Sequence, residues 1–394
     1  MSHDSFPNSL RLQPLASPVP LLVAPELYRQ LRALPDHESR RSFLAKEGEK
    51  LSSPFFPRGE HGGDFLYRRG RGLRFQWEAP DTMPGPYQVE LSEEADFRHF
   101  RIFRANKIWA QPRWETFVEI KEYEANLKVG TPYYWRVRFL PLPPSQAPET
   151  LSAVSVFLTE DLPPRIISRE KLFAVDGRVA NSRDVGGWRT REGRRVRQGL
   201  AYRMEAFDDP SPDTIHPGRN RLSVADREFF LETLGIRTDL DLRSPAETGK
   251  AGLSPLGPQV RYYNLPVEGY EEALTPEQRE ATGAVFHLLA QPQVYPLVFH
   301  CLGGADRTGM VAFLLNGLLG VPENDLCLDW ETTFLPHLPC EENPCALRCC
   351  QRLLEALREY GAPGDPLDQR IQAFLKTCGI TSQELLRLQE IFLE

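Results

Sequence analysis

The sequence predicts two different folds in series: an all-β sandwich, and then an α/β domain with a mostly parallel central sheet flanked by helices. Residues 62–160 contain short runs in which apolar and polar residues alternate, as they do in half-buried strands. From residue 173 onward, strand-like runs alternate with helical ones, which indicates parallel strands joined by helices. Prolines are also unevenly spread, because 19 of the 35 lie in residues 1–170. The two parts therefore differ in kind, and 394 residues suffice for two or three domains.

The predicted domain boundaries lie at these changes of pattern. Residues 1–61 are polar and punctuated by prolines, so we expect a leader that packs on the adjacent domain. Two short helices are expected in it, at Glu26–Ala33 and Glu38–Leu51. The remaining segments are the sandwich at 62–160, a linker at 161–172 and the α/β domain at 173–394.

The strands of the sandwich carry a resemblance to a known domain. Trp77 is followed by Pro80 on an early strand, and Gly130-Thr-Pro-Tyr-Tyr-Trp-Arg-Val137 stands late in the domain. This part resembles a fibronectin type III domain, an immunoglobulin-like sandwich. The resemblance implies binding or spacing rather than catalysis, with a protein or a carbohydrate as the partner. The expected strands are 73–77, 87–91, 100–103, 116–120, 127–137 and 152–157.

The α/β part shows the alternation that a βαβ arrangement requires. We expect strands at 238–242, 262–265 and 294–299. The expected helices are 223–234, 276–289, 307–319, 346–360 and 382–392.

The composition excludes several classes of protein. The formal net charge of −7 argues against a nucleic-acid binder, which needs a basic face. There is no run of 18 or more apolar residues, so we expect no membrane span. The apolar patch at 21–23 is short and lies between prolines, so we expect no export signal and favour a cytoplasmic location. Export stays open if a leader was removed.

The cysteines are concentrated late in the chain. All seven lie at or after Cys301, unlike the cysteines of a secreted disulfide scaffold. A cluster at 340–350 does not have the spacing of paired zinc ligands, and we predict no metal and no other cofactor. We expect this cluster to be reduced. In an exported protein, Cys340–Cys345 or Cys349–Cys350 would be the candidate pairs.

The strongest chemical signal is the run VFHCLGGADRTG from Val298 to Gly309. An apolar strand leads into Cys301, and an apolar helix starts at Arg307 after five residues. Such a strand–loop–helix turn aims backbone N–H groups and the positive end of the helix at one point, which favours a bound phosphate. Arg307 can hold two phosphate oxygens, and the same positive field favours the thiolate of Cys301, which is the nucleophilic form.

This run resembles the phosphate-binding loop of the cysteine-dependent tyrosine and dual-specificity phosphatases, in which Cys, five residues, Arg, and Ser or Thr succeed one another. The resemblance implies a phosphocysteine intermediate at Cys301 and a phosphate clamp at Arg307, without a metal. It also implies that the hydroxyl of Thr308 eases loss of the thiolate and that His300 sets the surroundings of the cysteine. The implied phosphate-binding residues are Leu302, Gly303, Gly304, Ala305, Asp306 and Arg307.

A wider resemblance links residues 173–319 to the bacterial atypical tyrosine and lipid phosphatases. The residues that match Arg183 and Asp184 line the pocket in such relatives. A buried salt bridge that supports the loop is an equal alternative for these two residues here. Three phrases carry this resemblance: Asn181-Ser-Arg-Asp-Val-Gly-Gly187, the stretch from Thr190 to Arg203, and Asp239-Leu-Asp-Leu-Arg243 with Glu247.

The proton donor for the leaving group is harder to assign. In the common dual-specificity pattern an Asp comes after a strand that ends in Leu-Pro-Val, and the aligned residue here is Gly269, with Glu268 beside it. Some related phosphatases carry Asp-Arg at the two positions that Asp306 and Arg307 occupy here, and in several of them this aspartate is taken as the acid. A carboxylate beside a bound phosphate retains its proton more readily. We favour Asp306 and place Glu268 second. Asp208, Asp209 and Asp213 stay open.

Two features bear on the phosphorylated substrate. Seven arginines against two acidic residues between Arg183 and Arg203 form either a basic wall for an acidic substrate or a solvated hairpin. The loop carries no lysine, and Ala305 stands where lipid-active relatives commonly have one. We therefore favour a phosphotyrosine or mixed phosphomonoester substrate over a phosphoinositide or inositol phosphate. A phosphate-binding pseudophosphatase is an alternative, because the usual acid is missing.

Overall fold

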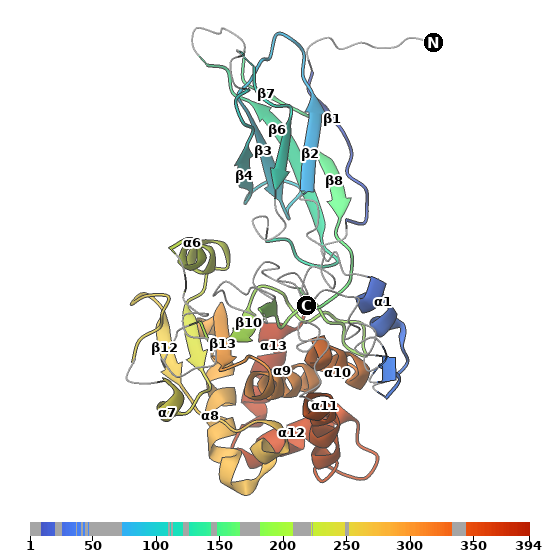
Figure 1. Ribbon diagram of the computed structural model, residues 1–394, viewed down its shortest axis with the longest axis vertical. Coiled ribbons are helices and arrows are strands. Elements are labelled where there is room, and N and C mark those ends of the chain that lie inside the picture. The colour runs from blue at the N-terminus through green and yellow to red at the C-terminus, as the bar shows by residue number, and fades with distance from the viewer. Residues whose placement is uncertain are drawn as a thin grey trace, which may run out of the picture. The chain divides into compact units, whose positions relative to one another are not determined.

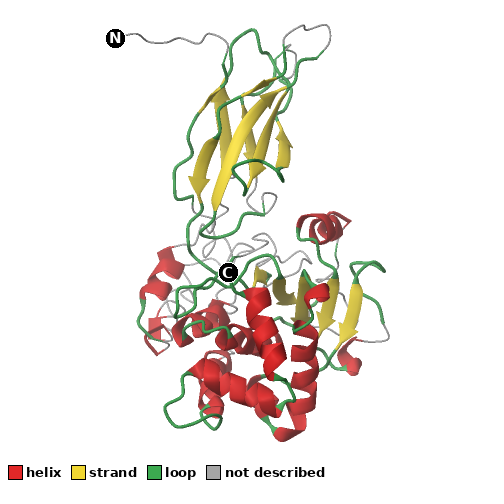
Figure 2. Cartoon of the chain, turned by 180° about the vertical axis from the view of Figure 1, so that it is seen from behind, coloured by secondary structure: helices red, strands yellow, loops and turns green. Residues whose placement is uncertain are grey.

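The structure is a computed structural model, in which two compact units are distinguished (Figures 1 and 2). One unit comprises Met1–Val23 and Gly70–Leu162, and the other comprises Ala24–Arg69 and Pro163–Glu394. The expected leader is thus divided between the two units. The described residues are 9–19, 26–36, 38–40, 42–43, 46, 73–108, 111, 113–120, 126–142, 148–165, 182–207, 222, 224–248, 252–332 and 344–394.

The first unit is made of two antiparallel sheets. One sheet has the order β1–β2–β5, with β1 at Arg11–Leu12, β2 at Leu73–Glu78 and β5 at Phe117–Ile120. The other has the order β4–β3–β6–β7, and β8 pairs with β6 as well. The strands of this second sheet are β3 at Tyr87–Ser92, β4 at Arg101–Arg104, β6 at Pro132–Phe139, β7 at Thr150–Leu151 and β8 at Ser155–Leu158.

The period-two pattern explains how this unit forms its core. In β2 and β6 every second side chain is buried, and Trp77 and Trp135 are among the residues packed inside. Each of the six expected strands has a counterpart within a few residues, so the strand prediction is confirmed. The resemblance to a fibronectin type III domain stays a prediction.

The second unit is built on a mixed five-stranded sheet with the order β12–β11–β13–β10–β9. The four strands β12, β11, β13 and β10 are parallel, and β9 pairs with β10 in the antiparallel sense at the edge. The bounds are β9 at Arg183–Asp184, β10 at Ala201–Glu205, β11 at Thr238–Asp241, β12 at Arg261–Asn264 and β13 at Leu297–Cys301.

The parallel register decides where side chains can converge. Glu205 at the end of β10 is paired with Cys301 of β13, and Asp241 at the end of β11 is paired with His300. Three strands therefore end at the same edge of the sheet, which is where open α/β sheets bind ligands.

Helices surround this sheet, and most were expected (Figure 1). The helix expected at 223–234 is an α-helix that continues into a π-helical turn, and the one expected at 276–289 begins with a 3-10 turn. No described helix is long and apolar enough to cross a membrane. The bounds are α1 at Glu26–Ala33, α6 at Val224–Glu228, η1 at Phe229–Thr233, α7 at Pro245–Thr248, η2 at Tyr270–Leu274, η3 at Pro276–Gln278, α8 at Arg279–Leu289, η4 at Pro292–Val294, α9 at Asp306–Leu318, α11 at Pro344–Leu357 and α13 at Ser382–Phe392.

One expected strand starts later than predicted, and two helices were missed. The strand expected from residue 294 starts at Leu297, because η4 and Pro296 precede it. Helix α10, at Glu323–Thr332, was missed because residues 326–332 are all buried, so no amphipathic stripe marks it. Helix α12, at Leu367–Thr377, was missed although its buried Ile371, Phe374 and Leu375 have helical spacing. Most of the helix expected at Glu38–Leu51 falls outside the described residues.

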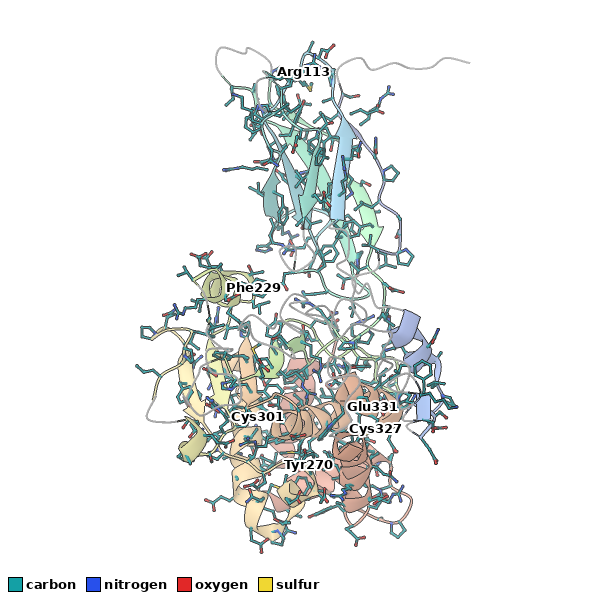
Figure 3. All side chains as sticks on the ribbon, in the orientation of Figure 1. Arg113, Phe229, Tyr270, Cys301, Cys327 and Glu331 are labelled. Atoms are coloured by element: carbon teal, nitrogen blue, oxygen red, sulfur yellow. A yellow bond between two sulfur atoms is a disulfide. The ribbon has the colours of Figure 1, made fainter. Side chains whose placement is uncertain are left out.

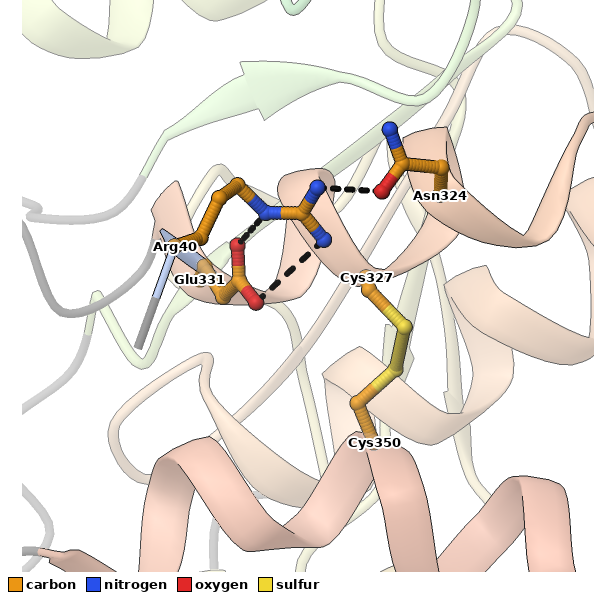
Figure 4. The surroundings of a disulfide bond; sticks show 5 residues. All are labelled: Arg40, Asn324, Cys327, Glu331 and Cys350. Atoms are coloured by element: carbon orange, nitrogen blue, oxygen red, sulfur yellow. Dashed lines mark hydrogen bonds and ion pairs between the residues drawn. A yellow bond between two sulfur atoms is a disulfide. The ribbon is translucent and has the colours of Figure 1, made fainter. Parts of the chain in front are cut away.

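The cysteine prediction was wrong for Cys350. It forms a disulfide with Cys327, which joins α11 to α10, and the two Cα atoms are 5.8 Å apart (Figure 4). Cys301 and Cys378 are buried free thiols. The bridge spans 23 residues and was missed because its partner lies on a neighbouring helix rather than within the cluster. Cys340 and the side chains of Cys345 and Cys349 are outside the described part.

Candidate active site

The predicted phosphate loop has the expected strand–loop–helix form. Cys301 ends β13 and is 3% exposed, while α9 begins at Asp306 (Figure 3). Gly304 has a φ of +64°, and a Cβ atom added to it would come within 2.4 Å of the backbone carbon of Met204. Only glycine fits this position, because the loop turns back directly over the end of β10. Gly303 has open space around it.

Arg307 is held in one orientation by a carboxylate. Its Nη1 and Nη2 atoms each donate to an oxygen of Glu247 over 2.7 Å. The backbone N–H and the hydroxyl of Ser244 also donate to Glu247, at 2.8 and 2.9 Å. The hydrogen bond from Arg307 lowers the pKa of Glu247 to about 2, and the same bond raises the pKa of Arg307. The guanidinium plane is therefore fixed before any ligand arrives.

His300 lies behind the loop in a pocket of carboxylates. Its Nε2 is 3.0 Å from the carboxylate of Asp239, its Nδ1 is 3.9 Å from Asp241, and its ring packs on Phe207. Burial disfavours the charged imidazole, but the two carboxylates outweigh this effect and raise the pKa of His300. Asp241 is also bound by Arg243. The predicted Asp-Leu-Asp-Leu-Arg strand thus supports the residue before the cysteine, a role that the sequence did not reveal.

Arg183 and Asp184 are both completely buried, so they lie in ion pairs and not on an open pocket wall. Arg183 donates to the carboxylate of Asp329 over 2.8 Å. Asp184 accepts from Arg165 at 2.9 Å and from two backbone N–H groups. Two roles were left open for these residues, in the pocket lining or in a buried salt bridge, and the structure contains buried salt bridges.

The arginines between Arg183 and Arg203 do not form a basic wall. Arg203 is 1% exposed and pairs with Asp329. Arg195 donates to the carbonyl oxygen of Gly187, and Arg197 donates to that of Ile391. Two others also have partners, which are Asp368 for Arg191 and the carbonyl oxygen of Gly193 for Arg189. Arg189, Arg191 and Arg194 are exposed, so part of the hairpin is solvated as the second alternative expects, whereas the other four arginines are buried or half-buried.

A cavity of about 950 Å³ opens beside the start of α9, and nearly all of its charged lining residues are acidic. Asp306 and Arg307 line it, whereas Cys301 and the loop 302–305 are not among its lining residues. Arg307 is its one basic lining residue among those described. The acidic lining residues are Glu247, Glu268, Glu272, Glu277, Glu280 and Asp306.

Two of the acid candidates lie at this cavity. Asp306 is the first residue of α9, and Glu268 is an exposed residue of the loop after β12. Gly269 packs closely on the start of α9, because a Cβ added to it would lie 3.4 Å from the Cβ of Asp306 and from the backbone nitrogen of Arg307. Asp208, Asp209 and Asp213 lie outside the described residues.

Thr308 completes the loop from the first turn of α9. It is fully buried, and its hydroxyl has no hydrogen-bond partner among the described residues. A buried hydroxyl without a partner is costly, so this group is available to a sulfur or phosphate oxygen at the loop.

Comparison with known proteins now identifies the class. The Tyrosine phosphatase family matches residues 175–394, more than half of the chain, so the protein belongs to this family. A Cupriavidus necator protein named "Putative tyrosine-protein phosphatase" is 31% identical over 186 residues, 39% of this chain and 59% of that protein. A Nostoc commune protein named tyrosine-protein phosphatase is 31% identical over 127 residues, 27% of this chain and 42% of that protein. The chain thus spans about half the length of these relatives.

One solved structure also shows a limited likeness to the chain. The core catalytic domain of the PP-IP phosphatase SIW14 from S. cerevisiae, in complex with citrate, aligns with a TM-score of 0.27 and 15% identity. The alignment covers 39% of this chain and 83% of that chain. A likeness of this size is too weak to indicate a shared substrate.

The ion pair between Glu247 and Arg307 predicts a pH dependence of stability. The pKa of Glu247 is lowered from 4.5 to about 2, so its contribution is fully present above pH 4.5 and is lost as the pH falls toward 2. Glu247→Gln lacks this contribution. We expect the variant to melt below the wild type at pH 6, and the difference in melting temperature to shrink between pH 4.5 and 2. A difference that stays constant over this range would contradict the expectation.

Proposed function

We propose that the second unit hydrolyses phosphomonoesters through a phosphocysteine intermediate at Cys301. The thiolate attacks phosphorus and forms a sulfur–phosphorus bond, while the bond to the leaving oxygen breaks and that oxygen takes a proton. Water then attacks phosphorus, releases inorganic phosphate and restores the thiolate. The observation that carries the proposal is the folded loop between β13 and α9. A buried thiol, Cys301, stands at its start, and Arg307, oriented by Glu247, stands in the first turn of α9.

The surrounding residues take supporting roles in this proposal. The unpartnered hydroxyl of Thr308 is suited to stabilise the departing thiolate. His300, held by Asp239, fixes the end of β13 from which Cys301 projects. Asp306 is the proposed proton donor and Glu268 the second choice, since both carboxyl groups line the cavity at Arg307.

The acidic cavity supports a phosphotyrosine protein, or a mixed phosphomonoester, over a polyanionic inositol phosphate. Six acidic side chains face one arginine there. A substrate with several phosphates would place further negative charge against these carboxylates, whereas a peptide with lysine or arginine beside its phosphotyrosine would be attracted. The names of the two relatives agree with a protein substrate. For the first unit we propose binding or spacing, as its fibronectin-like pattern implies.

Replacement of the nucleophile tests the proposed chemistry. We expect wild-type protein to hydrolyse p-nitrophenyl phosphate, with activity at background in Cys301→Ser. Cys378→Ser is the matched control, because Cys378 is also a buried free thiol in the described part of the chain and lies outside the loop. Phosphate binding without any turnover by the wild type would favour the pseudophosphatase instead.

Two leaving groups separate the candidate acids. Nitrophenolate departs without a proton, whereas phenolate needs one, so loss of the general acid should slow phenyl phosphate far more than p-nitrophenyl phosphate. We expect Asp306→Asn to lower kcat for phenyl phosphate by roughly 100-fold, and to abolish the fall in its rate at high pH. Glu268→Gln is the paired variant. If it shows this pattern and Asp306→Asn does not, the donor is Glu268.

Charge reversal at the cavity tests the substrate class. Glu272 and Glu277 line the cavity and are exposed, so Glu272→Lys combined with Glu277→Lys should keep the fold. We expect kcat/KM for a basic phosphotyrosine peptide to fall and that for an inositol polyphosphate to rise, each by about fivefold at low salt. Glu390→Lys, at an exposed position of helix α13, is the control. A wild type that prefers inositol polyphosphate would overturn the proposed order.

A further inference from the structure

We infer that Arg203 and Asp329 form a clamp that orients the phosphate-binding amides of the loop from behind. The inference rests on the proposed function only for the identity of the anion that these amides bind. It makes both side chains positioning residues, since neither touches the reacting atoms.

The clamp closes on two consecutive carbonyl groups of the loop. Nη2 of Arg203 donates to the carbonyl oxygen of Gly304 over 2.9 Å and to that of Ala305 over 3.3 Å. Nη1 of the same guanidinium donates to the carboxylate of Asp329 over 2.6 Å. One planar group thus joins β10, the loop and α10, as only an arginine can.

Because the peptide bond is planar, these contacts also orient the N–H groups of the loop. In a trans peptide the C=O and the following N–H point opposite ways. When Arg203 draws the carbonyl oxygens of Gly304 and Ala305 to one side, the N–H groups of Ala305 and Asp306 are turned to the other side. Those two groups belong to the end of the loop and the start of α9, where an anion would be bound.

Asp329 keeps the arginine in place and provides its counter-charge. It also accepts from Arg183 on the neighbouring strand β9, through its carboxylate at 2.8 Å and its carbonyl oxygen at 2.9 Å. Burial favours the protonated carboxyl, but the two guanidinium groups outweigh this and lower the pKa of Asp329. Loss of this charge would remove the counter-charge that the two buried guanidinium groups share and free the guanidinium of Arg203 from its second anchor.

The buried charge of Arg203 also contributes to the field at the cysteine. Burial lowers the pKa of Arg203 to about 9, with the charge of Arg183 acting in the same direction, while Asp329 and the Cys301 thiolate act to raise it.

Two variants and a matched control test the clamp in the full chain. Arg203→Lys keeps the charge but cannot bridge both carbonyls and Asp329, and Asp329→Asn removes the counter-charge. The control is Glu331→Gln, because Glu331 lies on the same helix and is buried in an ion pair with Arg40 (Figure 4). Melting temperatures report how much stability each variant loses.

The first readout is hydrogen–deuterium exchange of the ligand-free loop, residues 302–307. We expect at least tenfold faster exchange there in Arg203→Lys and Asp329→Asn, and less than twofold change in Glu331→Gln. The clamp is overturned if loop exchange is unchanged in the first two variants, or if the control raises it as much at a similar loss of melting temperature.

The second readout is tungstate affinity, measured by calorimetry with Cys301→Ser in every variant. We expect tungstate, a phosphate mimic, to bind at least tenfold more weakly when Arg203→Lys or Asp329→Asn is added. Equal binding would overturn the clamp. If the Cys301→Ser parent itself binds no tungstate, the proposed function fails, and the exchange data still decide whether the clamp exists.

Discussion

A guanidinium group that is taken out of water must be compensated, and the second unit is organised around this constraint. Arg183 and Arg203 share the carboxylate of Asp329, and Arg40 pairs with Glu331 on the same helix. Each pair joins segments that are far apart in the chain. An arrangement that separated the partners of such a pair would leave a buried charge without its counter-charge, which is costly. The pairs therefore favour one arrangement of the elements that they join.

The sequence predicts those features that depend on local chemistry. Most strands of the first unit, the strands β11, β12 and β13 of the second unit, the phosphate loop and the start of α9 are indicated by period-two runs, by glycine and by short apolar stretches. The short strands β1, β7 and β9, and strand β10, were not expected. The sequence shows a glycine at 304 but not why glycine is required there. The reason is the close approach of the backbone of Met204, which lies about one hundred residues earlier in the chain.

Long-range partners were beyond the reach of sequence patterns. Asp329 lies 126 residues from Arg203 on a helix without an amphipathic stripe, so neither its role nor its helix was expected. A run of arginines suggests an exposed surface because arginine is rarely buried without a partner. Here the partners include Asp329 and backbone carbonyl groups near the carboxyl terminus, and a pattern within the run cannot reveal them.

The match to the Tyrosine phosphatase family is confined to one of the two units. It covers residues 175–394, which lie wholly in the second unit. Membership in the family therefore accounts for the loop and its sheet, and the two-sheet unit has to be understood from its own surface.

The cysteines of the second unit require opposite redox conditions. Cys301, the proposed nucleophile, has to stay reduced for the proposed chemistry, while Cys327 and Cys350 are joined as a disulfide. Whether each couple is oxidised depends on its own reduction potential relative to that of the medium. A reductant strong enough to rescue an oxidised nucleophile can also release α10 from α11. The redox poise of the medium therefore sets two properties together, the state of the nucleophile and the tether of the helix that carries Asp329.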